Sequence, residues 1–316
     1  MKNDENFLKL KQKQKKRRQI STQIKCKFQC FKSPLVIICF IFLLIESFSL
    51  IYALLWAVMN SLKSINDFSE NLFGFPRQIM FDNYAKVYNK LYYYVRNDAG
   101  YQKIYFPQLV LNTILYSVPT TIIYTFSMAM VAYVSVKYRF WFNKVINTVV
   151  MFVVVFPGVA SLGSRLQFLH RIGFYDNYWA LLYGLICFAD YNFLIWAGVF
   201  KGIPDDYIEA AKIDGAGHYQ IMFQIVFPMA RVQFAILLVL GFIGRWNDYQ
   251  TALTTLPSMP NLALALYQFR ENTINAISWP TYRLAACLIV AIPCIILYII
   301  VEPIMVGNLT AGGLKG

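Results

Sequence analysis

Residues 201–228 read KGIPDDYIEAAKIDGAGHYQIMFQIVFP and carry start and stop signals for two short helices. Pro204 favours the beginning of a helix, because proline is tolerated where a backbone N–H has no helical partner. Asp206 is expected to be the N-cap, with Glu209 three residues later in a pattern that resembles a capping box. We therefore predict a short helix that begins next to Asp206.

A glycine turn and a second helix are expected to follow this first helix. Either Gly215 or Gly217 can adopt the positive φ that commonly ends a helix. Apolar residues then recur at helical spacing, at Tyr219, Met222, Phe223 and Val226. The segment thus predicts a helix, a turn and a second helix, with small residues that leave room for a partner to approach.

The chain around this segment is much more apolar. Hydrophobic residues make up 58% of the 316 residues and charged residues only 14%, whereas soluble domains carry about a quarter charged residues. A membrane-spanning helix needs about 20 mostly apolar residues. Six stretches meet or approach that length: Pro34–Met59, Gln108–Val134, Val145–Ser164, Tyr178–Phe200, Val232–Gly244 and Leu284–Ile304. We predict an all-α polytopic membrane protein with six transmembrane helices.

The first and fifth spans have alternative interpretations. The span Pro34–Met59 is too long for the apolar part of a signal peptide and lacks a following small-x-small cleavage site, so we expect it to be retained. The fifth span reaches full length only if it continues through Arg245 to Asp248. These two residues are three positions apart, so they could form an ion pair with each other.

The distribution of basic residues predicts the orientation. With the N-terminus in the cytoplasm, the inside segments hold 18 Lys and Arg residues and the outside segments hold 9, as expected from the positive-inside rule. Both termini are then cytoplasmic, and residues 201–228 form the largest loop between spans on the inside. The longest outside segment, 60–107, is rich in tyrosine and long enough to fold as a short helical cap.

Residues 1–33 form a basic arm, ahead of the transmembrane domain 34–304 and a short cytoplasmic tail 305–316. Six of the eight residues from Lys11 to Arg18 are basic, a density that also occurs in nucleic-acid-binding segments. Directly before a membrane helix, such a cluster more simply contacts anionic lipid, so we expect no nucleic acid. Cys26 and Cys30 have no histidine nearby, and we expect no metal site.

The segment 201–228 resembles the EAA loop of permease subunits in ATP-binding-cassette importers that depend on a binding protein. The family pattern is Glu-Ala-Ala, three residues, Gly, nine residues, Ile, one residue, Leu and Pro. Phe227 replaces the leucine of the pattern, a mild apolar change. The residues in register, together with the common Asp-Gly-Ala, are Glu209, Ala210, Ala211, Asp214, Gly215, Ala216, Ile225 and Pro228.

The resemblance covers most of the chain beyond the arm, and it is strongest to the carbohydrate branch, the type of the smaller maltose-importer permease. The other matching stretches are Asn60–Lys63, Phe81–Tyr84, Leu111–Thr113, Phe156–Gly158, Trp246–Tyr249 and Leu309–Gly316. The resemblance implies the type I importer permease fold, with the loop 201–228 acting as a coupling helix. It also implies a bacterial cytoplasmic membrane as the location.

The resemblance implies a set of partners. A second permease, usually a different chain, would complete the pathway, two ATPase subunits would bind the loop, and an extracytoplasmic binding protein would deliver the solute. The chain has no Gly-x4-Gly-Lys-Ser/Thr motif for nucleotide phosphates. We therefore expect this subunit to be no enzyme and to bind no cofactor, with ATP and Mg²⁺ held by the ATPase.

Polar residues inside the spans are candidates for the solute pathway, because such groups are costly in lipid and usually face a cavity or a partner. The candidates are Asp190, Asn192, Arg245, Trp246, Asn247, Asp248 and Tyr249. Carbohydrate is the solute implied by the family branch, and an oligosaccharide is favoured. An acidic sugar would suit Arg165, Arg171 and Arg245, which are expected on or near the outer side.

Three other functions remain open from the sequence. An importer of this kind could carry a solute other than a sugar. An ion-coupled secondary transporter would explain the buried charges, but it leaves the EAA spacing unexplained, and no inverted repeat is visible. A membrane enzyme is disfavoured because the only histidines, His170 and His218, are predicted on opposite sides of the membrane.

Overall fold

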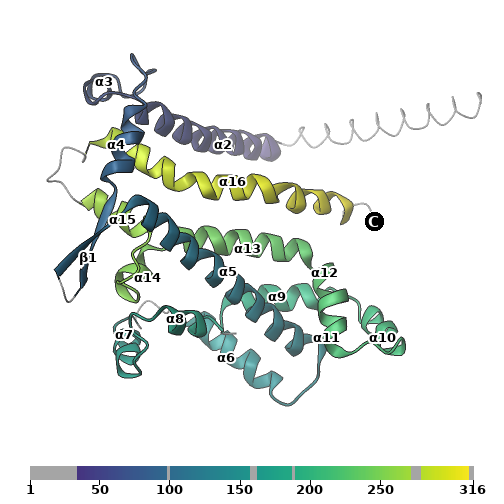
Figure 1. Cartoon of the computed structure of the whole chain (residues 1–316). Coiled ribbons are helices and arrows are strands. Elements are labelled where there is room, and N and C mark those ends of the chain that lie inside the picture. The colour runs from purple at the N-terminus through teal and green to yellow at the C-terminus, as the bar shows by residue number, and fades with distance from the viewer. Residues whose placement is uncertain (1–33, 98–99, 157–161, 187–188, 272–278, 313–316) are drawn as a thin grey trace, which may run out of the picture.

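The computed structural model describes residues 34–97, 100–156, 162–186, 189–271 and 279–312. The predicted basic arm, with its two cysteines, lies outside the described residues, as do Pro157 and Gly158. The described chain is helical apart from one β-hairpin, and its longest helices run roughly side by side (Figure 1).

Three helices are long and apolar enough to cross a membrane, and they correspond to the first, second and sixth predicted spans. These helices are α2 (Pro34–Ser61), α5 (Phe106–Lys137) and α16 (Pro280–Gly312). A fourth span results if α13 (Arg231–Trp246) is joined to the helical run His218–Met229, which meets it at a bend of 76°. These lengths and compositions are those of a multi-pass membrane protein.

The third and fourth predicted spans differ from the prediction. In the region of the third predicted span, α6 (Asn143–Val155) is only 13 residues long. The next helix, α7 (Leu162–Arg171), begins after residues 157–161, which are not among the described residues. The fourth is not one helix but two, α8 (Tyr178–Gly184) and α9 (Tyr191–Lys201). Asp190 explains the new start, because its backbone is extended and its carboxylate accepts a hydrogen bond from the N–H of Tyr191.

Helix α5 packs between α9 and α13 and positions both. Its buried side includes several hydroxyl residues whose small size allows neighbouring helices to approach closely. They are Thr113, Ser117, Thr120, Thr121, Thr125 and Ser127. The hydroxyl of Thr113 donates to Leu109 O at 2.6 Å, one turn earlier in the same helix, so this polar group is satisfied inside the bundle.

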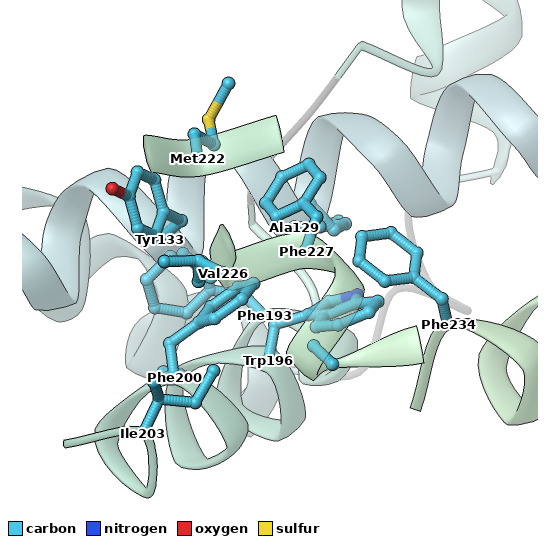
Figure 2. Close-up of a cluster of buried hydrophobic side chains, with 14 of the residues drawn as sticks. Ala129, Tyr133, Phe193, Trp196, Phe200, Ile203, Met222, Val226, Phe227 and Phe234 are labelled. Carbon is cyan, nitrogen blue, oxygen red and sulfur yellow. The ribbon is translucent and has the colours of Figure 1, made fainter. Parts of the chain in front are cut away.

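One core cluster lies where residues 201–228 meet the long helices. This segment forms α10 (Asp206–Ile213), α11 (His218–Gln220), the π-helical turn η3 (Ile221–Val226) and α12 (Phe227–Met229). Figure 2 shows Phe227 among the aromatic rings of α5, α9 and α13. Ring centres lie 6.0 Å apart for Phe227 and Phe200, and 5.0 Å apart for Phe227 and Phe234. The loop is thus packed into the helical bundle.

The opposite end of the molecule carries α3 (Ile65–Glu70), α4 (Asp82–Lys90), α14 (Tyr249–Thr254) and α15 (Leu262–Glu271) (Figure 1). The predicted helical cap over 60–107 is only partly helical, because Tyr92–Asn97 (β1) and Gly100–Tyr105 (β2) form an antiparallel hairpin. Its aromatic and β-branched residues favour strands, and its register pairs Tyr92 with Tyr105.

A charged contact attaches the loop 201–228 to the end of α5. The Nζ atom of Lys137 donates to Ile203 O at 2.6 Å and to Asp205 Oδ1 at 2.7 Å. The Lys137 side chain is almost fully buried, whereas that of Asp205 is exposed. The hydrogen bond from Lys137 lowers the pKa of Asp205 below its ordinary value, because it favours the ionised carboxylate.

Replacing Trp196 by alanine should destabilise the protein strongly. Its indole is fully buried and lies 4.3 Å from the ring centre of Phe234, so the change leaves a cavity in the core cluster. We expect the free energy of unfolding to fall by roughly 3–5 kcal/mol, measured by thermal unfolding of the purified protein in detergent. Trp141→Ala is the control, because that side chain is 83% exposed. Equal losses for both variants would contradict the packing role.

The Lys137–Asp205 contact should persist as the pH falls from 7 to 5. A carboxylate with a lowered pKa in the folded state stabilises that state above its unfolded pKa of about 3.9 and loses this effect only at lower pH. The difference in Tm between the wild type and Asp205→Asn should therefore be equal at pH 7 and pH 5. A difference that disappears by pH 5 would show that the lowered pKa is wrong.

Candidate functional site

Helix α10 begins one residue earlier than the predicted capping pattern. The N-cap is Asp205 rather than Asp206, and the side chain of Asp205 makes no cap hydrogen bond to the helix. The physical reason is that the Asp205 carboxylate is already bonded to Lys137. Asp206 and Glu209 both lie in the first turn of α10, where negative charge interacts favourably with the helix dipole.

The glycine turn after α10 has the predicted backbone geometry. Gly215 has a φ of 81°, whereas Gly217 has an ordinary φ of −72° and precedes α11. The N–H of Ala216 donates to Ala211 O at 2.9 Å across the turn, which satisfies a carbonyl at the end of α10. The choice left open between the two glycines is therefore decided in favour of Gly215.

Helix α10 has a buried face and an exposed face. Ile208 and Ala211 are buried in the core cluster, so they hold α10 against the long helices. Glu209, Ala210 and Asp214 face solvent, together with Gly215. Of the predicted coupling residues on this helix and turn, Ala211 therefore helps to hold α10 against the bundle. Glu209, Ala210, Asp214 and Gly215 are accessible to another protein.

The exposed face also carries large apolar side chains that the motif did not indicate. On α10, Ile213 is 86% exposed and Tyr207 is also exposed, and Tyr219 of α11, after the glycine turn, is 79% exposed. Spacing contains a usable signal, because Tyr207, Ala210 and Ile213 recur every three residues while Ile208 and Ala211 occupy the buried side. Contiguous exposed apolar patches commonly mark protein-binding surfaces, so these side chains are candidates for contact with another protein.

The second predicted helix is present, but it extends further than expected. It runs as α11, η3 and α12, and Pro228 lies at the beginning of α12 rather than beyond the helix. Ile225 is half-buried against the core cluster, and Pro228 is exposed. A π-helical turn changes which residues face the core, and η3 buries Ile221, Met222 and Val226.

A second site is a cavity of about 250 Å³ between α5, α9 and α13. Tyr124 of α5 is one of its lining residues and is a residue that the sequence did not single out. Its hydroxyl donates to Asp190 Oδ2 and accepts from Asn192 Nδ2 at 3.0 Å. The guanidinium carbon of Arg245 lies 5.2 Å from the centre of the Tyr124 ring, within the range of a cation–π interaction.

The structure thus brings together three of the seven predicted pathway residues, Asp190, Asn192 and Arg245, around one tyrosine. The cavity presents a guanidinium, an amide and an aromatic ring to its interior, with apolar neighbours such as Trp196 and Leu237. Such a combination can hydrogen-bond a polar solute and cover an apolar face of it. A tyrosine in the middle of a predicted span was the available signal for Tyr124.

The four consecutive residues Trp246–Tyr249 make contacts in different parts of the structure. Trp246 is buried and its Nε1 donates to Val290 O at 2.9 Å, which ties α13 to α16. Asp248 caps α14 and accepts from the hydroxyl of Tyr116 at 2.6 Å. The spacing of Arg245 and Asp248 allowed an ion pair between them. Instead, Arg245 lies over the ring of Tyr124, and Asp248 accepts from Tyr116. Asn247 and Tyr249 line a separate cavity.

Known proteins that are similar to this chain are permease subunits of transport systems. The family model described as binding-protein-dependent transport system inner membrane component matches residues 109–305. A diacetylchitobiose uptake system permease protein of Streptomyces coelicolor is 26% identical over 273 residues, covering 85% of this chain and 86% of its own length. A galactooligosaccharides transport system permease protein of Bacillus subtilis is 27% identical, covering 84% of this chain and 91% of its own.

A solved structure supports the fold. One chain of a bacterial ABC transporter involved in the import of the acidic polysaccharide alginate is similar with a TM-score of 0.69 and 24% identity, covering 84% of this chain and 94% of its own length. The family model matches more than half of the sequence. The chain therefore belongs to the family of binding-protein-dependent transport system inner membrane components.

Proposed function

We propose that this chain is one of two permease subunits in an ATP-binding-cassette importer for carbohydrate. The observation that carries the proposal is the unit α10–α12, which packs on the long helices through Ile208 and Ala211 and presents Glu209, Ala210 and Ile213 to solvent. A helix held rigidly from within and exposed outside is suited to receive force from another protein. The similar permeases from two bacteria belong to saccharide uptake systems.

The exposed face of α10 would dock in a cleft of an ATPase subunit, with Glu209 and Asp214 at the contact and Gly215 setting the turn. ATP and Mg²⁺ would be bound by that partner, and this chain would bind no cofactor. Closure of the ATPase dimer would pull α10, and the core cluster around Phe227 and Trp196 would transmit that motion to α5, α9 and α13. Close-packed aromatic groups transmit displacement well because such interiors are hardly compressible.

Six spans follow if α6 with α7 and α8 with α9 each cross the membrane as interrupted helices. Broken helices are tolerated at membrane depth where they line a cavity, and Asp190 at the start of α9 contacts Tyr124 at such a cavity. The bias of Lys and Arg would place both termini and α10–α12 in the cytoplasm. The basic arm would then lie on anionic lipid, and the binding protein would dock at the opposite end.

The cavity around Tyr124 would be part of the solute pathway. Sugar rings combine apolar faces with hydroxyl groups, and Tyr124, Asn192 and Arg245 offer a ring together with hydrogen-bonding groups. The second permease would supply the remaining wall. An oligosaccharide is the favoured solute, since the relatives from Streptomyces and Bacillus are named for oligosaccharides.

Replacing Glu209 by alanine should uncouple transport from ATP hydrolysis. Loss of one docking contact is expected to reduce solute uptake by about tenfold, equivalent to roughly 1.4 kcal/mol of docking free energy. Uptake and binding-protein-stimulated ATP hydrolysis by the reconstituted complex are the measurements. Asp206→Ala is the control, because Asp206 is an exposed acid in the same helical turn. Normal coupling in Glu209→Ala would contradict the docking role.

The two glycines of the loop allow a second matched test. Gly215→Ala forces an alanine into a left-handed conformation at a cost of roughly 1–2 kcal/mol, although no neighbouring atom would meet the new Cβ. Gly217→Ala has an ordinary φ and needs no such conformation. We expect Gly215→Ala to impair ATPase binding in co-purification and Gly217→Ala to retain it. The reverse order would refute the importance of the turn.

Tyr124→Phe should impair solute uptake while the docked ATPase remains active. The change removes the hydroxyl that joins Asp190 to Asn192 and leaves the ring over which Arg245 lies. Tyr178→Phe is the control, since its hydroxyl donates only to the backbone oxygen of Leu115. We expect uptake by Tyr124→Phe to fall severalfold with unchanged basal ATP hydrolysis. Equal losses of uptake in Tyr124→Phe and Tyr178→Phe would show that the cavity is not part of the solute pathway.

A further inference from the structure

A second cavity, of about 400 Å³, lies at the end of the molecule opposite α10–α12. It is lined by residues at the end of α13 and on α14, α15 and α16, and it shares none of its lining with the cavity around Tyr124. The lining residues with polar side-chain groups that the proposal uses are Asn247, Tyr249, Tyr267 and Arg283, and Phe269 adds a third aromatic ring. Its volume falls in the range of about 300–1,000 Å³ that is usual for small-molecule sites.

Arg283, in the first turn of α16, is the charged group of this cavity. Its Nε atom is buried and has no hydrogen-bond partner. Within the described part of the chain, no carboxylate forms an ion pair with this side chain. Arg283 as a whole is only partly buried, but a buried guanidinium N–H without an acceptor is costly. A planar carboxylate can bond this N–H and a second one of the same guanidinium through two parallel hydrogen bonds. The position therefore calls for an anionic partner.

Two tyrosines form a flat aromatic surface beside Arg283. The rings of Tyr249 and Tyr267 are stacked, with centres 4.6 Å apart and planes inclined by 9°. Their side chains are 40% and 39% exposed, so part of this surface remains accessible. A stacked pair is more rigid than a single ring, and its open face suits the apolar face of a pyranose, while the two phenol hydroxyls can bond sugar hydroxyls.

Asn247 adds a hydrogen-bonding group to the same cavity. Its amide nitrogen donates to Ile243 O at 2.8 Å, one turn earlier in α13. This bond fixes the side chain and leaves the amide oxygen as an acceptor for a hydroxyl group. A cation, a flat aromatic pair and an acceptor thus converge on one space.

We propose that this cavity is a subsite for an acidic saccharide unit, with the carboxylate of the sugar on Arg283 and its ring on the Tyr249–Tyr267 pair. The proposal rests on the proposed function as a carbohydrate permease and adds the chemical class of the solute. It assigns to Arg283 the anion-binding role that the sequence suggested for Arg165, Arg171 and Arg245. The first two lie exposed on α7, and Arg245 lies over the ring of Tyr124. A lipid phosphate could satisfy the guanidinium, but it gives no role to the paired rings.

The test uses the complete importer with its binding protein in proteoliposomes. Uptake of a short oligouronate is compared with uptake of a neutral oligosaccharide of the same length, together with stimulated ATP hydrolysis. For Arg283→Gln we expect oligouronate uptake to fall by about tenfold to a hundredfold, the effect of losing a charge-assisted hydrogen-bonded pair. Neutral uptake and ATP hydrolysis should stay near wild type. Arg171→Gln, which removes the same charge from an exposed position, should change neither sugar.

Arg283→Lys keeps the charge but loses the planar fork, so an intermediate loss of oligouronate uptake is expected even if the glutamine variant folds poorly. Equal losses for both sugars would assign Arg283 to the structure or to a lipid phosphate and overturn the proposal. Unchanged oligouronate uptake in Arg283→Gln would also overturn it. A wild-type complex that moves only neutral sugars would refute the acidic subsite alone, whereas one that moves no saccharide would refute the proposed function as well.

Discussion

The packing of Phe227 against the aromatic side chains of α5, α9 and α13 joins the segment 201–228 to the helical bundle. Phe227 lies in the segment that follows the glycine turn, and it meets Phe200 of α9, Phe234 of α13 and Tyr133 of α5. Phe227 acts together with the buried residues Ile208 and Ala211 and with the Lys137–Asp205 contact in holding residues 201–228 against the bundle. In the proposed mechanism, a displacement of α10 would be passed to these three helices, because close-packed rings leave little space to absorb it.

The same helices carry the polar groups that a solute could meet. Tyr124 lies two turns before Ala132, which belongs to the core cluster, and Arg245 lies near the far end of α13, the helix that begins at the bend beside Phe227. A force applied at α10 therefore acts on the helices that enclose the cavity. Buried polar side chains are tolerable there because they bond one another or their own helix, as Tyr124 does with Asp190 and Thr113 with Leu109.

Several features of the site could be predicted from the sequence because they depend on local chemistry. Gly215 and Gly217 were both candidates for a positive φ, since glycine adopts it without strain, and Gly215 is the one that does so. The capping residue was predicted one position away from the observed one, because the bond from Lys137 to Asp205 joins residues that are distant in sequence. Local patterns contain no information about such a partner.

The sequence by itself determined the first, second and sixth apolar spans, the two short helices with a turn between them in residues 201–228, and the family pattern, since each depends on composition or on spacing along one helix. Only the tertiary structure decided which polar residues share a cavity, because that depends on how helices are rotated against one another. It placed Tyr124 between Asp190 and Arg245, buried Trp246 against α16, and joined Asn247 to Tyr267 and Arg283 in a separate cavity. Side chains adjacent in sequence on a helix point in different directions, about 100° apart, so the consecutive residues 245–249 had to be distributed among different neighbours.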